Sequence, residues 1–208
     1  MKAVDENTFF SVENAPDSER LLWDTTSRTR SFDTVIFGLN TVHRKSRDGR
    51  EGDIVEIDTR DGVNIIPYFI GTDGVARFVM ERQFRHGSES ITLEFPAGLI
   101  ERGEAPVKAA ARELLEETGI RAASLKQLGA ISQNAAYINN TIYYFLAETL
   151  TQEVGLEDRQ LDAFEQIDVI SVPVDTVLEK LGTGEYDNAI AVLGGYFFQR
   201  EMALRNKS

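Results

Sequence analysis

The sequence predicts an α/β (α+β) protein with one main domain and an N-terminal arm. Runs of β-branched and aromatic residues are separated by turn sequences in the first half of the chain, which indicates antiparallel strands. One glutamate-rich helix follows a strand, and two further helical patterns lie near the C-terminus. With 208 residues the chain can bury one substantial core. We therefore expect an arm over residues 1–50 and a single domain over residues 51–208.

The first half of the chain is expected to form an antiparallel meander. The arm begins with a polar stretch that is compatible with a short helix after Pro16. Further on, "RDGREG", "RDG" and "GTDG" contain the Gly and Asp residues that reverse strands. These turns separate four predicted strands, at residues 31–45, 52–60, 63–71 and 75–85. A fifth strand, "ITLEFPAGLI", is expected to be interrupted at Pro96 and Gly98, because proline cannot donate to a strand ladder.

The second half begins with the glutamate-rich helix, which is expected from about Ala105 to Thr118. Pro106 suits a first helical position, and Gly119 suits the residue just past a helix end. Three strands and two helices should follow. The strands are predicted at residues 125–134, 140–150 and 164–174, and the helices at residues 174–185 and 187–204.

Composition narrows the classes of partner and compartment. The formal net charge of −12 repels nucleic acid and anionic lipid, so we expect neither nucleic acid nor a membrane as a general partner. The chain has no cysteine and therefore no disulfide or thiolate chemistry. Acidic residues stand near the N-terminus where a signal peptide would need an apolar core. A cytoplasmic location is the simplest expectation.

The glutamate-rich helix is predicted to have two contrasting faces, because successive residues rotate by roughly 100°. The packing face is expected to hold Val107, Ala110, Ala111, Leu114 and Thr118. The opposite face holds Glu113, Glu116 and Glu117. Three carboxylates within one turn repel each other, and the helix dipole disfavours them near its C-terminus. A solvated face with one Arg112–Glu116 pair explains this arrangement poorly, whereas a hard divalent cation such as Mg²⁺ would relieve both costs.

The spacing of this segment resembles the signature of the Nudix hydrolases. Its fixed positions are Gly98, Glu104, Arg112-Glu113-Leu114, Glu116-Glu117 and Gly119-Ile120, and all of them match. The resemblance implies the Nudix fold, an α/β/α sandwich with a mixed sheet, and hydrolysis of a nucleoside diphosphate linked to another group. It also implies that Glu113, Glu116 and Glu117 hold metal, that Arg112 orients a glutamate and that Glu104 supports the loop.

The flanking sequence resembles one branch of that family, the ADP-ribose and nucleotide-sugar pyrophosphatases, over about Gly52 to Leu204. The carrying motifs are "RQFR" and "EFPAG". By this resemblance the Ala97 carbonyl coordinates metal and Arg85 contacts the diphosphate, with Arg60 and Arg82 as weaker substrate-binding candidates. An exposed strand-end cation is the competing interpretation of Arg85.

The segment "LDAFEQIDVISVP" resembles the loop of that branch in which an acid reaches the metals or the attacking water. Glu165 is the matching residue, and Asp162 and Asp168 are nearby alternatives. One departure concerns specificity, since the branch has a proline-containing turn after the signature and this chain has "SQNAAYINNT" there. The choice of base and sugar therefore stays open.

Together these features predict Mg²⁺-assisted hydrolysis of a phosphoanhydride, with Mn²⁺ as a substitute and Glu165 or Glu117 as the general base. The expected substrate is a small nucleoside diphosphate derivative, with ADP-ribose cleaved to AMP and ribose 5-phosphate. Another nucleotide sugar or a dinucleotide is the alternative substrate. A non-catalytic sensor ranks last, because sensors lose signature carboxylates and this chain retains them. We also expect a homodimer formed through the arm.

Overall fold

The structure is a computed structural model that describes residues 18–161 and 166–207. The chain divides into two compact units. The first comprises residues 1–59 together with 136–139, and the second comprises residues 60–135 together with 140–208. Within the described residues, no helix combines the length and apolar character needed to cross a bilayer.

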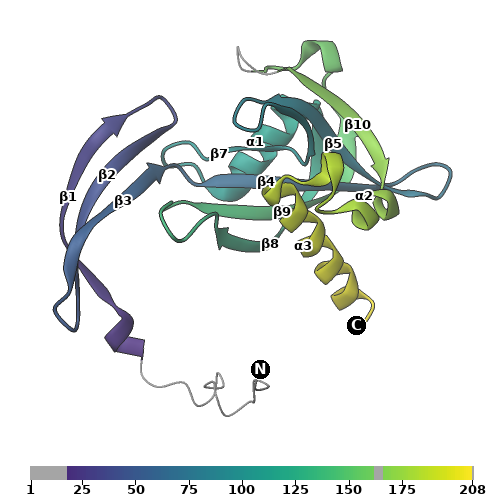
Figure 1. The fold of residues 1–208 in the computed structure, drawn as a ribbon. Coiled ribbons are helices and arrows are strands. Elements are labelled where there is room, and N and C mark those ends of the chain that lie inside the picture. Colours follow the sequence, from purple (N-terminus) through teal and green to yellow (C-terminus); the bar gives the residue numbers. More distant parts are fainter. Residues whose placement is uncertain (1–17, 162–165, 208) are drawn as a thin grey trace. The chain divides into compact units, whose positions relative to one another are not determined.

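The first unit contains a three-stranded antiparallel sheet in the order β1-β2-β3 (Figure 1). A 3₁₀ turn, η2 (Ser18–Leu21), precedes β1 (Trp23–Asp33), β2 (Phe37–Ser46) and β3 (Glu51–Thr59). The short helix expected after Pro16 is therefore present. The single strand expected over residues 31–45 is wrong, because a turn separates β1 from β2 there. The Thr34 hydroxyl stabilises that turn by donating to the Phe37 carbonyl over 2.6 Å.

Strand β1 was not predicted from the sequence. All of its residues are exposed, and its sequence, "WDTTSRTRSFD", lacks the alternation of apolar and polar residues that indicates a strand. Ladder hydrogen bonds to β2 and ion pairs that reach across to β3 hold it instead. Arg28 Nε lies 3.1 Å from Glu56, and Arg30 Nη2 lies 2.5 Å from Asp58. Such long-range pairing leaves no periodic signal in the strand itself.

The second unit is built on a mixed sheet in the order β10-β5-β4-β9-β8, with β6 paired to β5 and β7 paired to β4. Strand β4 runs parallel to β9, whereas the other pairs are antiparallel. The strands are β4 (Gly62–Ile70), β5 (Ala76–Arg85), β6 (Ser90–Glu94), β7 (Ala97–Leu99), β8 (Ile120–Ser132), β9 (Thr141–Gln152) and β10 (Ile167–Pro173). The break predicted at Pro96 is confirmed, since it separates β6 from β7, whereas the break predicted at Gly98 is wrong because Gly98 lies within β7.

Helices cover both faces of this sheet (Figure 1). Helix α1 (Pro106–Thr118) lies on one face, and α2 (Val174–Lys180) and α3 (Ala189–Arg205) lie on the other. Short 3₁₀ turns, η3 (Leu156–Asp158) and η4 (Gly184–Tyr186), complete the unit. Neighbouring residues of β9 point to opposite faces of the sheet. Phe145 belongs to the core that contains Leu114 of α1, and Tyr144 belongs to the core that contains Phe198 of α3. The sandwich that the sequence predicted is therefore confirmed.

Helix α1 begins and ends at the predicted signals. Pro106 occupies its first turn, and Gly119 follows its last turn in the left-handed conformation with φ 69°. The predicted packing face is partly wrong, because Val107 is 44% exposed and Ala111 is also exposed. The buried residues are Ala109, Ala110, Leu114, Glu117 and Thr118. The helix is rotated so that Glu117, which hydrogen-bonds to the Ala97 amide, faces inward.

Candidate active site

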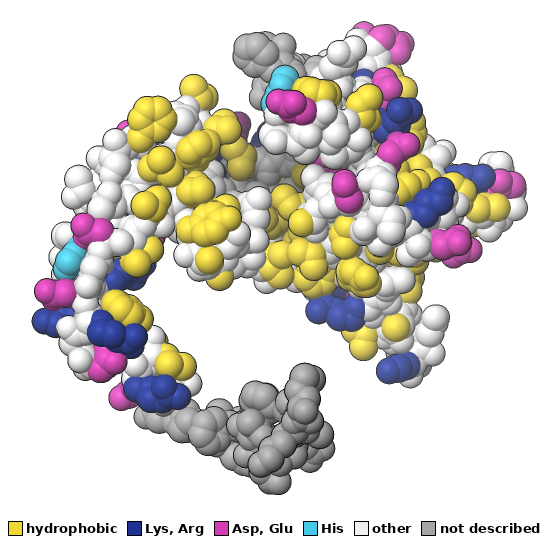
Figure 2. Space-filling model, viewed as in Figure 1, with side chains coloured by type: hydrophobic (Ala, Val, Ile, Leu, Met, Phe, Trp, Pro, Cys, Tyr) yellow, Lys and Arg dark blue, Asp and Glu magenta, His cyan; other side chains and the backbone are white. Residues whose placement is uncertain are grey.

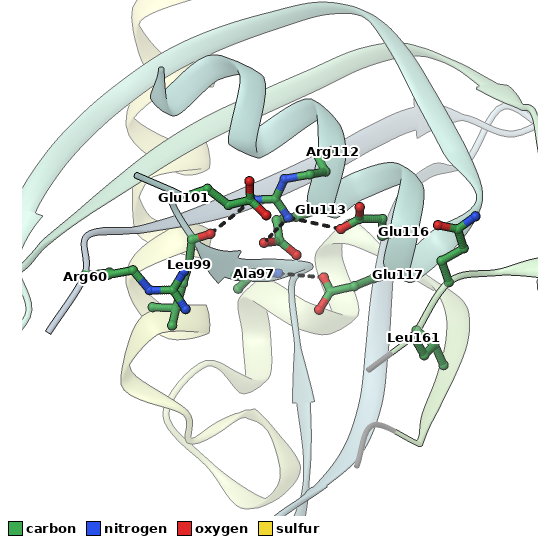
Figure 3. A pocket seen from close by; sticks show the side chains of 11 residues that line it. Arg60, Ala97, Leu99, Glu101, Arg112, Glu113, Glu116, Glu117 and Leu161 are labelled. Atoms are coloured by element: carbon green, nitrogen blue, oxygen red, sulfur yellow. Dashed lines mark hydrogen bonds and ion pairs between the residues drawn. The ribbon is translucent and has the colours of Figure 1, made fainter. Parts of the chain in front are cut away.

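A polar cavity of about 440 Å³ lies between α1, β7 and the segment that precedes β10. Its lining comes from four parts of the second unit (Figure 3). These are Arg60, the β7 strand with Glu101 after it, the helix residues Arg112, Glu113, Glu116 and Glu117, and the pair Gln160 and Leu161. The three glutamates predicted to hold metal therefore line one cavity.

Arg112 is the centre of a hydrogen-bond network beside this cavity. Its guanidinium binds Glu104 through Nε at 3.1 Å and through Nη2 at 2.9 Å. It also donates to Glu113 at 2.7 Å and to Glu116 at 3.0 Å (Figure 3). The Leu99 carbonyl of β7 accepts a further bond at 3.1 Å. A planar guanidinium with five donors can satisfy so many acceptors at once, whereas a lysine cannot.

This network shifts the pKa values of Glu104 and Arg112. The Arg112 hydrogen bond holds the pKa of Glu104 below its ordinary value, and the backbone amide of Glu101 adds to the effect. In return, the hydrogen bond with Glu104, followed by that with Glu113, raises the pKa of Arg112. Arg112 is therefore a permanent cation that offsets the mutual repulsion of the glutamates.

The backbone of strand β7 lies close to the carboxylates of Glu117 and Glu113. The Glu117 carboxylate, only 4% exposed, accepts a 2.9 Å hydrogen bond from the Ala97 amide. Gly98 faces Glu113 so closely that an added Cβ would lie 2.1 Å from the carboxyl carbon. The signature glycine is therefore required for space, because any side chain at this position would displace Glu113.

The donor set suits a hard divalent cation. Three carboxylates face a cavity whose lining is predominantly polar, and oxygen ligands are those that Mg²⁺ prefers. Across residues 18–161 and 166–207, no group of three acidic or histidine side chains has the arrangement of a metal site. Glu113 and Glu116 instead accept hydrogen bonds from Arg112, and Glu117 accepts one from the Ala97 amide. Binding a cation between them requires these carboxylates to exchange part of those contacts for the ion.

The predicted substrate-binding arginines occupy different places. Arg60 is exposed and lines the cavity, as Figure 3 shows. Arg85 instead binds Glu94 through two hydrogen bonds of 2.8 and 2.7 Å and is not among the lining residues. Arg82 lines a separate hollow with Asp168 on the neighbouring strand. Of the three, Arg60 lines the cavity, whereas Arg85 lies near enough to Glu117 that its pKa is raised by the hydrogen bond with Glu94 and further by the charge of Glu117.

Glu165, the acidic residue predicted to reach the metals or the attacking water, lies outside the described residues, and so does its alternative Asp162. The second alternative, Asp168, belongs to β10 and pairs in register with Arg82. Asp168 is therefore not among the residues that line the cavity with Glu113, Glu116 and Glu117.

Sequence reasoning missed several neighbours of the site. Glu94, which the "EFPAG" motif contains but to which the sequence assigned no role, is 3% exposed and is the partner of Arg85. Gln160 and Leu161 form one wall of the cavity, and the preceding residue Arg159 binds the end of α1. Glu81 on β5 lies directly opposite Glu94 on β6, and both are buried. The sequence alone does not show that these two glutamates are neighbours.

Comparisons with known proteins agree with this geometry. The family model described as "NUDIX domain" matches residues 59–192. An ADP-ribose pyrophosphatase from Bacillus subtilis (strain 168) is 33% identical over 129 residues, which cover 62% of this chain and 69% of the relative. An ADP-sugar pyrophosphatase from Mus musculus is 32% identical over 161 residues, or 76% of this chain and 66% of the relative. A crystal structure of an ADP compounds hydrolase, 23% identical, has a similar fold, with a TM-score of 0.76 over 89% of this chain and 97% of that one.

Proposed function

Because this chain belongs to the Nudix family, we propose that it hydrolyses the pyrophosphate bond of a nucleoside diphosphate derivative. ADP-ribose is the substrate we favour, with AMP and ribose 5-phosphate as products. The observation that carries the proposal is the complete signature, whose three helix glutamates line one cavity together with Arg60. Two relatives whose names specify ADP-ribose and ADP-sugars support the choice of substrate.

We infer that Mg²⁺ is the cofactor and that Mn²⁺ can replace it. Glu113, Glu116 and Glu117 would hold the ion, together with the Ala97 carbonyl at the end of the cavity. Bound Mg²⁺ neutralises diphosphate charge and lowers the pKa of a water. Arg112 keeps Glu113 and Glu116 directed to the same side of α1, and Gly98 leaves room for Glu113. The charge and the space in the site thus fit a divalent cation, which these carboxylates would hold.

The proton of the attacking water would pass to a glutamate. Glu117 and Glu165 are the two candidates for this general base. Glu117 already accepts a 2.9 Å hydrogen bond from the Ala97 amide, so one of its carboxylate oxygens is engaged by the backbone. We therefore favour Glu165 as the base and Glu117 as a ligand.

Phosphate recognition is assigned to arginines. Arg60 faces the carboxylates across the cavity, so it can bind the diphosphate oxygens that the cation leaves exposed. Arg85 is held by Glu94 and would contact the diphosphate with the part of its guanidinium that faces solvent, since its side chain is 42% exposed. Arg82 would contribute only to the outer part of the substrate.

A panel of nucleoside diphosphate derivatives tests the proposed reaction. With Mg²⁺ present, we expect ADP-ribose to be consumed fastest and to yield AMP and ribose 5-phosphate, identified by chromatography. Faster turnover of another nucleotide sugar or of a dinucleotide would change the proposed substrate but keep the proposed reaction. Turnover of nucleoside triphosphates or capped RNA alone would contradict the assignment. Tight binding of ADP-ribose without any cleavage would indicate a non-catalytic sensor instead.

We further propose that the protein is a homodimer. Its three-stranded sheet exposes apolar side chains, some of which are visible in Figure 2 (yellow). The exposed set comprises Trp23, Phe32, Val35, Ile36, Ile54 and Val55. A sheet of this size has little independent stability in water unless an apolar face is covered. A second copy of the chain would cover it.

Sedimentation equilibrium should give about twice the chain mass of 23.3 kDa at micromolar concentration. We expect Val55→Lys, at a residue 60% exposed on β3, to shift the distribution toward one chain. Ile70→Lys is the matched control, because Ile70 is 56% exposed but belongs to the second unit. A mass of one chain for the unmodified protein at all micromolar concentrations would contradict the dimer.

A further inference from the structure

Arg159 makes an unusual set of contacts beside the candidate active site. Its guanidinium donates to three main-chain carbonyls from three different segments. Nε donates to Leu156 in η3 at 2.7 Å, and Nη2 donates to Ile167 at the start of β10 at 2.9 Å. Nη1 donates to the Glu117 carbonyl in the last turn of α1. One side chain therefore joins η3, β10 and the helix that carries the signature glutamates.

The contact with α1 has a clear physical basis. The last carbonyls of a helix lack partners within the helix, and the dipole makes this end negative. Glu113, Glu116 and Glu117 add further negative charge in the same region. A guanidinium placed on the Glu117 carbonyl donates to an acceptor at the helix end and offsets part of that charge. Its planar fork of donors also suits several carbonyls at once, which a lysine could not bind together.

The position of Arg159 in the chain links this contact to the cavity. The next two residues, Gln160 and Leu161, line the cavity that Glu116 and Glu117 also line, as Figure 3 shows for Leu161 and the glutamates. Arg159 binds the backbone of Glu117, the residue whose side chain faces Ala97. Arg159 thus ties the backbone next to the Gln160–Leu161 wall directly to the backbone of Glu117.

We propose that Arg159 is a positioning residue for the hydrolytic site, an inference that rests on the proposed pyrophosphohydrolase function. It holds the wall formed by Gln160 and Leu161 against the C-terminal end of α1. Without it, the segment that leads to the wall would keep its backbone bonds from Glu153 and Val154 to the Gly119 carbonyl but would lose its direct link to the last turn of α1. Displacements of about 1 Å in a catalytic site can lower activity by about 10²-fold.

Two substitutions at Arg159 and one matched control test the proposal. Arg159→Ala removes all three bonds, and Arg159→Lys keeps the charge but loses the planar fork. Arg200→Ala is the control, because Arg200 also donates to a main-chain carbonyl, that of Leu128, and lies over the Phe197 ring on α3. Neither Arg200 contact involves a residue that lines the cavity. Tm, kcat and KM for ADP-ribose, and Mn²⁺ affinity from the paramagnetic resonance signal of free Mn²⁺ are measured for each.

We expect Arg159→Ala to lower kcat by about 10²-fold and to weaken Mn²⁺ binding, while Arg200→Ala leaves both near the unmodified values. Arg159→Lys should fall between them, because a single ammonium replaces the fork. Added guanidinium, at a concentration that does not change Tm, should restore part of the kcat of Arg159→Ala. A kcat and Mn²⁺ affinity within about twofold of the unmodified protein, with a Tm loss like that of Arg200→Ala, would overturn the proposal.

Two further outcomes remain decisive. If Arg159→Ala does not fold, the comparison passes to Arg159→Lys, whose unchanged kcat and Mn²⁺ affinity would also overturn the proposal. If the unmodified protein cleaves none of the panel, the proposed function fails. The Mn²⁺ affinities still decide whether Arg159 positions the carboxylates, because that readout does not depend on hydrolysis.

Discussion

Glu117→Gln should lower Mg²⁺-dependent hydrolysis by about 10³-fold or more while the protein stays folded. The substitution removes a charged oxygen ligand, and a bound divalent cation contributes several kcal/mol of transition-state stabilisation. The glutamine carbonyl oxygen can still accept the hydrogen bond that the Ala97 amide gives to Glu117, so the contact between α1 and β7 is kept. Initial rates with ADP-ribose across a Mg²⁺ titration, together with Tm, measure both effects.

Two related variants sharpen this experiment. Glu116→Gln removes a second candidate ligand, and its loss of the partly exposed pair with Arg112 should cost only about 0–1 kcal/mol of stability. Glu179→Gln is the matched control, since Glu179 is an exposed glutamate in the last turn of α2. Without added metal, Glu117→Gln should unfold at the same temperature as the unmodified protein or slightly higher, because like charges near the helix C-terminus are fewer, whereas in Glu116→Gln this gain is offset by the lost pair with Arg112. Near-normal turnover in Glu117→Gln with an unchanged Mg²⁺ requirement would contradict the proposal that the α1 glutamates hold the metal.

A single methyl group at Gly98 should be nearly as damaging. An added Cβ would lie 2.1 Å from the Glu113 carboxyl carbon and 2.2 and 2.4 Å from its oxygens. Glu113 would have to leave this position, and its 2.7 Å contact with Arg112 would change with it. Because a small displacement of a positioned group is costly in catalysis, we expect Gly98→Ala to reduce kcat/KM by about 10²-fold.

Gly87→Ala provides the control for this prediction, since an added Cβ there meets nothing within 4 Å. It should keep normal activity and Tm. Gly98→Ala should show a raised Mg²⁺ requirement together with its lower activity, because Glu113 is a proposed ligand. If Gly98→Ala and Gly87→Ala are equally active, the close approach of β7 to Glu113 has no role in hydrolysis.

The sequence by itself determined the local features of the site. The start of α1 at Pro106, its end before Gly119 and the spacing of its glutamates all follow from short-range rules of helix capping and periodicity. The interruption of the fifth strand at Pro96 is likewise local, because proline lacks an amide to donate. The complete signature then identified the family that the comparisons show.

Only the tertiary structure decided which groups meet at the site. It rotated α1 so that Glu117 is buried, and it paired Arg85 with Glu94 and Arg159 with the end of α1. Strand β1 likewise depends on ion pairs with residues of β3 that lie 28 positions further along the chain. Such contacts join polar side chains to partners distant in sequence, and they have no repeat or local propensity that a single sequence could display. Their geometry exists only after the sheet has brought the segments together.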